Sequence, residues 1–386
     1  MLFASGAAAQ NGFDFAPPVV LDLGFDAYPN SVDAGHIDGD PWIDLVLAGR
    51  NNDGFAVIFY GTPGGFGPAV LLDMGGQTNW AVVRDFNSNS GFNDLVLSHR
   101  SGLGRISVLP GNGTQEPGEP IVYPAGRGPQ LLGAADLDGD QDLDLAVFNA
   151  GSFDISILAN DGFGVFTPVQ RIAVSRTASS SASPTWAQIV DVDGDGHPDI
   201  VAMNLQSHGA VSILHNRGDG TFDTAVQHAV AGIETGEAMS TLTAVDLDGD
   251  NDVDLVTKVG GLSFQDRIVV LTNDGTGSFD TAIHIQLQSS PWDITTVDFD
   301  NDGHPDIAWV THAFSSQAIG FVRNLGSSTP DFATPEPEIT LGGFPRAVIC
   351  FDIDGDTDLD VIVANIGSHD VAVLENLHIQ AQSGQP

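Results

Sequence analysis

Residues Asp246-Leu-Asp-Gly-Asp-Asn-Asp-Val-Asp254 place five carboxylates at alternate positions of one short stretch. Two like charges about 4 Å apart repel each other by about 1 kcal/mol in water, and by about 4 kcal/mol at an effective dielectric constant of about 20. A divalent cation would offset this repulsion, and Ca²⁺ takes about six to eight oxygen ligands from carboxylates, backbone carbonyls and water. The stretch is therefore interpreted as a calcium-binding loop.

Each position of this loop has a predicted role. The side chains at positions 1, 3, 5 and 9 are predicted to face the metal, and position 7 is predicted to supply its backbone carbonyl. Gly249 at position 4 suits a left-handed turn, and the apolar Val253 at position 8 is expected to pack beneath the loop.

Six further copies of this loop occur along the chain. Asp136–Asp144 and Asp352–Asp360 also have all five carboxylates. Asp191–Asp199 and Asp298–Asp306 have His at position 7, which is acceptable where only the carbonyl is needed, and Asn301 takes the place of the glycine at position 4. Two weaker copies come first in the chain, His36–Asp44 and Asp85–Asp94, with three and two acids.

The five strong loops predict about five Ca²⁺ sites, and the two weaker loops would bring the number to seven. The predicted metal-binding residues of the strong loops are Asp136, Asp138, Asp140, Asp142, Asp144, Asp191, Asp193, Asp195, His197, Asp199, Asp246, Asp248, Asp250, Asp252, Asp254, Asp298, Asp300, Asp302, His304, Asp306, Asp352, Asp354, Asp356, Asp358 and Asp360. Those of the weak loops are Asp38, Asp40, Asp44, Asp85, Asn87, Asn89 and Asp94.

The seven loops begin 49 to 55 residues apart, so the chain is an internal repeat of one supersecondary unit. Each unit has the pattern of four short strands, with the metal loop between the first and the second. In the third repeat the predicted strands are 130–135, 143–148, 155–158 and 167–174. Four antiparallel strands repeated seven times predict an all-β fold, a seven-bladed β-propeller.

The two ends of the chain complement each other. Phe13 to Leu23 resemble an outer fourth strand, whereas the last repeat stops after its third strand, Val371–Leu374. The N-terminal strand is therefore predicted to complete the last blade and to close the ring, which removes an exposed sheet edge. The alternative is exchange of this strand with a neighbouring copy, which would give filaments.

These patterns predict the domain organisation. Residues 13–379 form a single propeller domain, and residues 380–386 form a C-terminal tail. Residues 1–12 are a signal-peptide remnant or a flexible tail, because Ala7-Ala-Ala9 resembles a signal cleavage site without a charged or long apolar region before it.

The composition is strongly acidic. The chain has 386 residues, 51 acids and 12 bases, and 28 of the acids lie in the seven loops. A net charge of −39 repels nucleic acids and anionic membranes. No apolar run of about 18 residues is present, which predicts no membrane insertion. The single cysteine, Cys350, lies in an apolar run and is expected to be a buried small hydrophobe.

The repeats resemble the FG-GAP/VCBS class, which includes integrin α-subunit propellers and many secreted bacterial proteins. Asp191–Asp199 carries the motif Asp-x-Asp-x-Asp-Gly-x-x-Asp most closely. The resemblance implies a propeller fold, structural Ca²⁺ on the face opposite the ligand, and an extracellular location. Members of this class serve in adhesion, sugar binding and the scaffolding of enzymes, so the resemblance does not single out one function.

The face opposite the metal loops is the candidate ligand face. Three tryptophans are predicted at matching positions just before the first strand of alternate blades, near the mouth of the central channel. An aromatic ring with an arginine nearby suits a sugar or a peptide. The alternative is that the tryptophans fill the channel as core residues. The candidate residues are Trp80, Trp186, Trp292, Arg50, Arg100 and Arg346, with histidines such as His99 on the same face.

The sequence has no Gly-x-Ser-x-Gly elbow, no His-Glu-x-x-His motif and no phosphate loop, so an enzyme is not expected. The predicted function is non-catalytic, extracellular binding of a glycan or a protein. Two alternatives remain open at this point. One is a structural unit of a surface layer or filament, built from copies of the chain, and the other is a polysaccharide-active enzyme.

Overall fold

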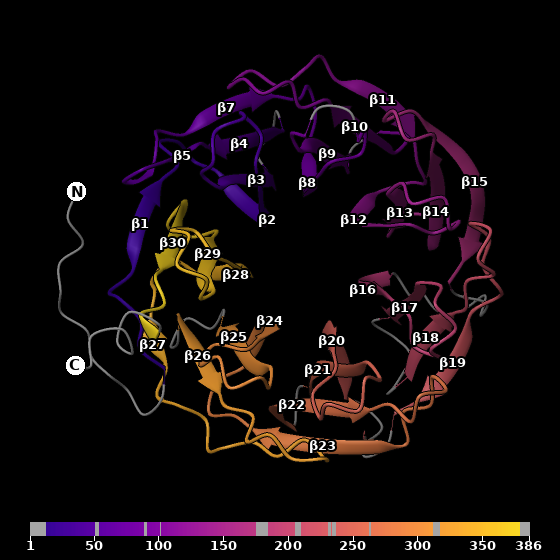
Figure 1. The fold of residues 1–386 in the computed structure, drawn as a ribbon, viewed down its shortest axis with the longest axis vertical. Helices are drawn as coiled ribbons and strands as arrows, with labels where there is room; N and C mark the ends of the chain where they lie inside the picture. Colours follow the sequence, from indigo (N-terminus) through magenta and orange to yellow (C-terminus); the bar gives the residue numbers. More distant parts are fainter. Residues whose placement is uncertain are drawn as a thin grey trace.

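The computed structural model describes residues 13–378 except 51–53, 89–90, 101, 175–183, 205–209, 231–232, 234–236, 262–263 and 312–316. Both tails predicted from the sequence, and Asn89 of the second loop, therefore lie outside the described residues. Within the described part, seven four-stranded antiparallel sheets are arranged as blades around a central opening (Figure 1). This confirms the predicted all-β propeller.

The first four blades follow one another along the chain and begin with β2, because β1 belongs to the last blade. Blade 1 consists of β2 (Tyr28–Gly35), β3 (Asp44–Arg50), β4 (Phe55–Phe59) and β7 (Val70–Asp73). Blade 2 consists of β8 (Thr78–Arg84), β9 (Asp94–His99), β10 (Arg105–Leu109) and β11 (Ile121–Pro124). Blade 3 consists of β12 (Pro129–Ala135), β13 (Asp144–Asn149), β14 (Asp154–Asn160) and β15 (Phe166–Ala173). Blade 4 consists of β16 (Pro184–Val190), β17 (Asp199–Asn204), β18 (Ala210–Leu214) and β19 (Val226–Ala229).

The remaining blades complete the ring. Blade 5 consists of β20 (Ala238–Val245), β21 (Asp254–Gly261), β22 (Phe264–Thr272) and β23 (Thr281–Gln286). Blade 6 consists of β24 (Pro291–Val297), β25 (Asp306–Thr311), β26 (Ala318–Val322) and β27 (Ile339–Thr340). Blade 7 consists of β28 (Pro345–Phe351), β29 (Asp360–Asn365), β30 (Asp370–Leu374) and β1 (Val19–Asp22). A short hairpin, β5 (Gly61–Thr62) and β6 (Gly65–Phe66), lies outside the blades.

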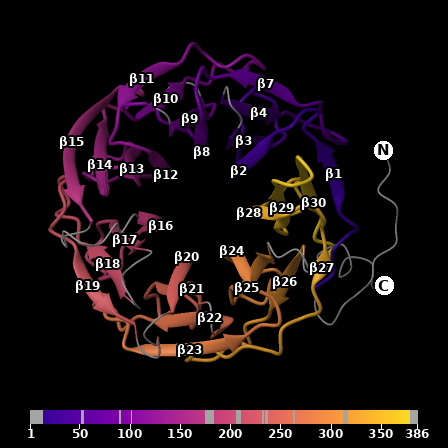
Figure 2. The ribbon, with the colours of Figure 1, turned by 180° about the vertical axis from the view of Figure 1, so that it is seen from behind.

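The first strand of every blade lines the central opening, and the fourth lies at the rim (Figures 1 and 2). In blade 3 the four strands lie within about two residues of the predicted bounds. The prediction succeeds because apolar side chains alternate along each strand, as they do where one face of a sheet is buried. Among the described residues, no helix is long and apolar enough to cross a membrane.

The hydrophobic core is divided among the blade interfaces. Seven buried apolar clusters lie between neighbouring blades, one at each interface. The second residue of a metal loop enters the cluster shared with the next blade, as Leu247 does between blades 5 and 6 and Phe299 between blades 6 and 7. Each loop is therefore anchored in the contact that joins two blades.

The ring is closed by the N-terminal strand, as predicted. β1 pairs antiparallel with β30 in the register Val19 to Val373 and Asp22 to Asp370. Phe15 forms an isolated bridge with Asn376, and Phe13 and Phe15 pack on Phe321 with ring centroids 5.6 Å and 4.8 Å away. The closure therefore lies within one chain and buries the edge of β30.

The first strand of each blade carries an irregularity near its start that the sequence analysis did not anticipate. The register of the first strand against the second shifts there in all seven blades, as between Pro291 and Asp293. An extra residue of this kind leaves the ladder and re-aims its side chain. We call the residues at this position, six before each metal loop, the bulge ring: Asn30, Asn79, Gln130, Thr185, Ser240, Trp292 and Arg346.

Candidate functional site

The metal loops connect the first and second strands, at the end of each blade opposite the bulge ring. The aspartate at position 9 is the first residue of the second strand and is 0–1% exposed in all seven blades. One of its oxygens accepts the backbone N–H of loop position 2 at 2.7–3.3 Å. The other accepts a backbone N–H just after the third strand at 2.7–2.9 Å. Position 9 therefore ties the loop to the third strand.

Burial changes the acidity of these carboxyl groups. Desolvation raises the pKa of Asp254 and of Asp306 to about 7, and that of Asp360 to about 8, although the donated N–H groups act in the opposite direction. The neighbouring loop carboxylates raise these pKa values further. In the metal-free protein these aspartates are held in a position that favours the protonated form.

The metal-free protein is expected to lose stability as the pH rises from about 4 to about 8. Because the folded-state pKa of these aspartates lies above the unfolded value, the folded state binds protons more tightly, and this contribution is complete below pH about 4 and lost through pH 7 to 8. Thermal melts of chelator-treated, desalted protein at pH 5, 6, 7 and 8 test this. A melting temperature that rises steadily over this range would contradict it.

The aspartate at position 1 organises the turn of the loop. In the fifth loop, Oδ1 of Asp246 accepts the N–H of Gly249 at 2.8 Å, and Oδ2 accepts the N–H of Asn251 at 3.0 Å. Positions 4 and 6 both have positive φ, 78° at Gly249 and 70° at Asn251. The sequence analysis predicted the left-handed position 4, including Asn301 with φ of 54°, but not position 6.

The loops have the oxygen donors that a cation needs. One carboxylate oxygen from each of Asp246, Asp248 and Asp250 lies within 4.8 Å of the others, and the equivalent aspartates of the fourth and sixth loops form similar groups. Oδ1 of Asp248 and Oδ1 of Asp300 are buried without a hydrogen-bond partner among the described residues. A buried acceptor of this kind fits a hard divalent cation, which takes carboxylate oxygens.

Position 7 shows why a histidine is tolerated in two loops. The side chain at this position lies against a glycine of the turn between the third and fourth strands. A Cβ at Gly218 would lie 2.5 Å from the His197 ring, and one at Gly275 would lie 2.6 Å from Oδ2 of Asp252. The side chain is thus directed at the turn in both kinds of loop, consistent with a role for the backbone carbonyl alone.

One recurrent position of the repeat was not among the residues predicted from the sequence. In five blades an asparagine lies at the end of the third strand or within two residues after it, and its Nδ2 donates to the carbonyl of position 2 in the preceding blade's loop at 2.7–2.9 Å. These asparagines, 0–7% exposed, fasten each loop to the next blade: Asn160, Asn216, Asn273, Asn324 and Asn376. The recurrence of Asn at one position of five repeats was the available signal.

The two weak loops are held by side-chain hydrogen bonds. In the second loop, Nδ2 of Asn87 donates to Oδ1 of Asp94 at 2.9 Å. In the first loop, Nε2 of Gln115 donates to Oδ2 of Asp38 at 3.1 Å. Amide donors therefore satisfy part of the carboxylate set in these two loops.

On the face opposite the metal loops, two of the three tryptophans do not lie where the sequence predicted. Trp80 and Trp186 lie inside the first strands of blades 2 and 4, not before them, and their rings meet edge to face with centroids 6.1 Å apart. Both pack against the apolar clusters between blades. They are core residues of the channel wall, as the alternative reading held.

Trp292 is not equivalent to these two, which corrects the predicted match. It lies one residue further from its metal loop, in the bulge ring, and it is 36% exposed. The guanidinium carbon of Arg346, the bulge residue of the next blade, lies 4.5 Å from the centre of the Trp292 ring. Trp292 is the second residue of β24 and lies at the end of this strand that is away from the metal loop, which we call the channel mouth.

The other predicted ligand-face residues have different surroundings. His99 is fully buried, its Nε2 lies 2.8 Å from Oγ of Ser107, and burial lowers its pKa to about 4, so it is a neutral core residue. Arg100 is exposed at the end of β9. The side chain of Arg50 lies outside the described residues.

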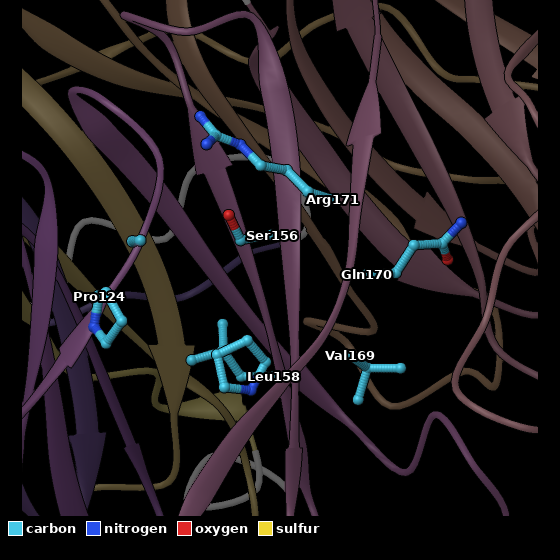
Figure 3. Close-up of a pocket in the computed structure, with 8 residues that line it drawn as sticks. Pro124, Ser156, Leu158, Val169, Gln170 and Arg171 are labelled. Carbon is cyan, nitrogen blue, oxygen red and sulfur yellow. The ribbon is translucent and has the colours of Figure 1, made fainter.

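A depression of about 320 Å³ lies at the rim between blades 2 and 3 (Figure 3). Pro124, Ser156, Val169 and Arg171 are among its lining residues. Arg171 already forms an ion pair with Asp154 at 2.6 Å. Its charge is therefore used within the blade, and the channel mouth is the stronger candidate for a ligand.

Comparisons with known proteins agree with this geometry. The FG-GAP-like repeat family matches residues 136–202, 191–257 and 260–309. A search of curated protein sequences gives no match.

Among solved structures, the chain is similar to BBS1N from its complex with ARL6DN, with a TM-score of 0.61 and 13% identity over 94% of this chain and 98% of that one. It is also similar to an Agrocybe aegerita lectin studied for recognition of non-reducing terminal N-acetylglucosamine. That likeness has a TM-score of 0.54 and 17% identity over 92% of this chain and 91% of that one. At these identities the likeness concerns the fold alone.

Proposed function

Because the chain is an FG-GAP repeat protein with a seven-bladed propeller fold, we propose that it is a secreted, calcium-stabilised binding module without catalytic activity. Residues 13–379 act as one domain, and the ligand is a glycan or an extracellular protein. The observation that carries the proposal is the exposed stack of Trp292 and Arg346 at the channel mouth, on the face opposite the acidic loops. A protein-binding propeller and a lectin among the structures of similar fold support it.

Calcium is the proposed cation because FG-GAP repeats often bind it and because the donors in these loops are oxygens. When bound, it would offset half of the negative charge of the four carboxylates at positions 1, 3, 5 and 9. The loop is connected to the rest of the fold at two positions. The aspartate at position 9 accepts a hydrogen bond from the backbone next to the third strand, and the side chain at position 2 packs in the interface between blades. Metal binding is thereby coupled to the stability of the ring.

The loops are not expected to bind calcium equally. In the sixth loop, Nη2 of Arg323 lies 2.8 Å from Oδ2 of Asp300 and already supplies a positive charge. In the seventh blade the corresponding residue is Glu375, which adds a carboxylate. Arg323→Gln is expected to tighten calcium binding at the sixth loop by about tenfold, because the competing charge is removed.

Calorimetric titration of Arg323→Gln and of the wild type measures this difference. Arg217→Gln is the matched control, since Arg217 pairs with Asp223 in an exposed turn outside the loops. An identical isotherm for Arg323→Gln and the wild type would show that the ion pair has no influence on the metal.

The binding function is tested on a glycan array and by pull-down of cell-surface proteins, using the calcium-loaded protein. Trp292→Ala is expected to lose the ligand, and Phe163→Ala is the control because Phe163 is an aromatic residue 72% exposed in a rim turn. Failure to bind any glycan or protein above background would refute the proposal. Turnover of polysaccharides by the same samples would indicate an enzyme instead.

A further inference from the structure

The channel mouth has two chemically different sides. On one side the bulge ring is made of amides. Nδ2 of Asn30 donates to Oδ1 of Asn79 at 2.8 Å, and Nδ2 of Asn79 donates to the backbone oxygen of Gln130 at 2.7 Å. On the other side, Trp292 and Arg346 come from β24 and β28, which lie side by side at the central opening (Figure 1). Blade 1, with Asn30, is the next neighbour of Arg346.

Arg346 and Arg100, at the channel mouth, differ from most other described bases in their electrostatic partners. Among the bases that the structure describes, six pair with carboxylates: Arg84, Arg171, Arg217, Lys258, Arg267 and Arg323. Burial lowers the pKa of Arg346, the Asp293 carboxylate acts in the opposite direction, and the guanidinium of Arg100 lowers the pKa further. Neither guanidinium donates a hydrogen bond to another described residue.

Asp293 acts on Arg346 more strongly than Arg100 does, but one carboxylate can offset only one of the two positive charges. Asp293 is 6% exposed, and its oxygens accept the N–H of Val348 at 3.0 Å, the N–H of Ile294 at 3.0 Å and Oγ1–H of Thr241 at 3.3 Å. It attracts Arg346 electrostatically but uses its acceptors elsewhere. In a chain with 51 acids, two neighbouring arginines whose guanidinium groups donate to no residue in the described part of the chain are best explained by an anionic ligand.

Building on the proposed function, we propose that the channel mouth binds an acidic saccharide, with a uronate carboxylate on the guanidinium of Arg346. The exposed part of the Trp292 ring offers a flat apolar surface for the sugar ring, and the half-buried amides of Asn30 and Gln130 offer partners for hydroxyl groups. Arg100 adds attraction from the edge of the mouth.

The net charge of −39 does not prevent this recognition. Charges more than about 8 Å from the ligand are largely screened at physiological ionic strength. A carboxylate in contact with a half-buried guanidinium is screened much less. The attraction between the ligand carboxylate and the Arg346 guanidinium therefore outweighs the repulsion from distant acids. Calcium bound in the loops would lower the net negative charge of the protein further.

The test compares a glucuronate-terminated trisaccharide with its carboxyl-reduced, glucose-terminated counterpart by calorimetry. The calcium-loaded full chain is used in 150 mM salt. The acidic trisaccharide is expected to bind at least about tenfold more tightly. Arg346→Gln is expected to weaken it by about ten- to hundredfold, as loss of a charge-assisted contact does. Arg100→Gln, an exposed change that leaves the fold intact, should weaken it by about threefold.

Arg127→Gln is the control, because Arg127 is exposed on the same face and outside the bulge ring. Equal binding of both trisaccharides would overturn the acidic class and leave the proposed glycan function standing. Tighter binding of a peptide carboxylate than of the acidic trisaccharide would overturn the sugar assignment. If neither trisaccharide binds while another array glycan does, this inference fails alone; if nothing binds, both proposals fail.

Discussion

Chelator-stripped protein is expected to bind about five Ca²⁺ and to gain at least about 10 °C in melting temperature. A ligand that binds only the folded state stabilises it by about 2.7 kcal/mol per site at a hundredfold excess over its Kd. Several such sites add up to a large share of a typical net stability of about 5–15 kcal/mol. The loops hold 28 acids and join three strands through position 9, so their repulsion acts on the whole ring.

Calorimetry and thermal melting with Asp248→Ala test the site assignment. Asp248 has a buried oxygen without a hydrogen-bond partner in the described structure, so its removal should delete one site and shrink the gain in melting temperature. Asp26→Ala is the matched control, because it removes the same charge from a side chain that is 94% exposed and outside the loops. Absence of calcium binding and of any thermal shift would refute the structural-metal proposal.

The second large effect is expected at Asp254. Its oxygens accept the N–H groups of Leu247 at 3.1 Å and Asn273 at 2.9 Å, and the residue is 1% exposed. Asp254→Ala leaves two buried donors unsatisfied, at about 1–3 kcal/mol each. We therefore expect a loss of about 2–6 kcal/mol in the free energy of unfolding, measured by urea denaturation.

The control for this prediction lies in the same loop. Asp250 at position 5 is exposed and makes its contact within the loop, with the N–H of Asp252. Asp250→Ala should therefore weaken calcium binding while changing the metal-free stability by less than about 1 kcal/mol. Asp254→Ala should destabilise the protein both with calcium and without it. If the two variants behave alike in chelator, position 9 has no structural role of its own.

The fold could be predicted because its determinants are local and repeated. The acidic loops, such as Asp191–Asp199, recur at nearly constant spacing, and each is flanked by strands of simple alternation. The closure of the ring followed from counting strands at the two ends, and β1 does pair with β30. These features require no knowledge of which residues meet across the ring.

The fastening of the loops and the channel mouth could not be predicted in the same way. Asn273 contacts a carbonyl 81 residues away, in a different blade. Trp292 lies six residues before its metal loop, whereas Trp80 and Trp186 lie five before theirs. Counting back from the loops detects this difference, but the register shift at this position shows only in the pairing of β24 with β25. Five of the bulge residues do follow a proline, as Arg346 follows Pro345, which is a signal that could have been used.

The antiparallel pair of β1 and β30, which closes the ring, also determines how the protein would respond to mechanical force. Val19 at the entry of β1 lies opposite Val373 at the exit of β30, so a pull on the two ends of the domain acts at the same end of the ladder. The hydrogen bonds of that ladder would then be loaded one after another, as in a zipper, instead of together in shear. When the protein is tethered at both ends, the contacts of Phe13 and Phe15 with Phe321 of blade 6 are therefore expected to yield first, followed by the pair of β1 and β30, so that the ring opens at blade 7.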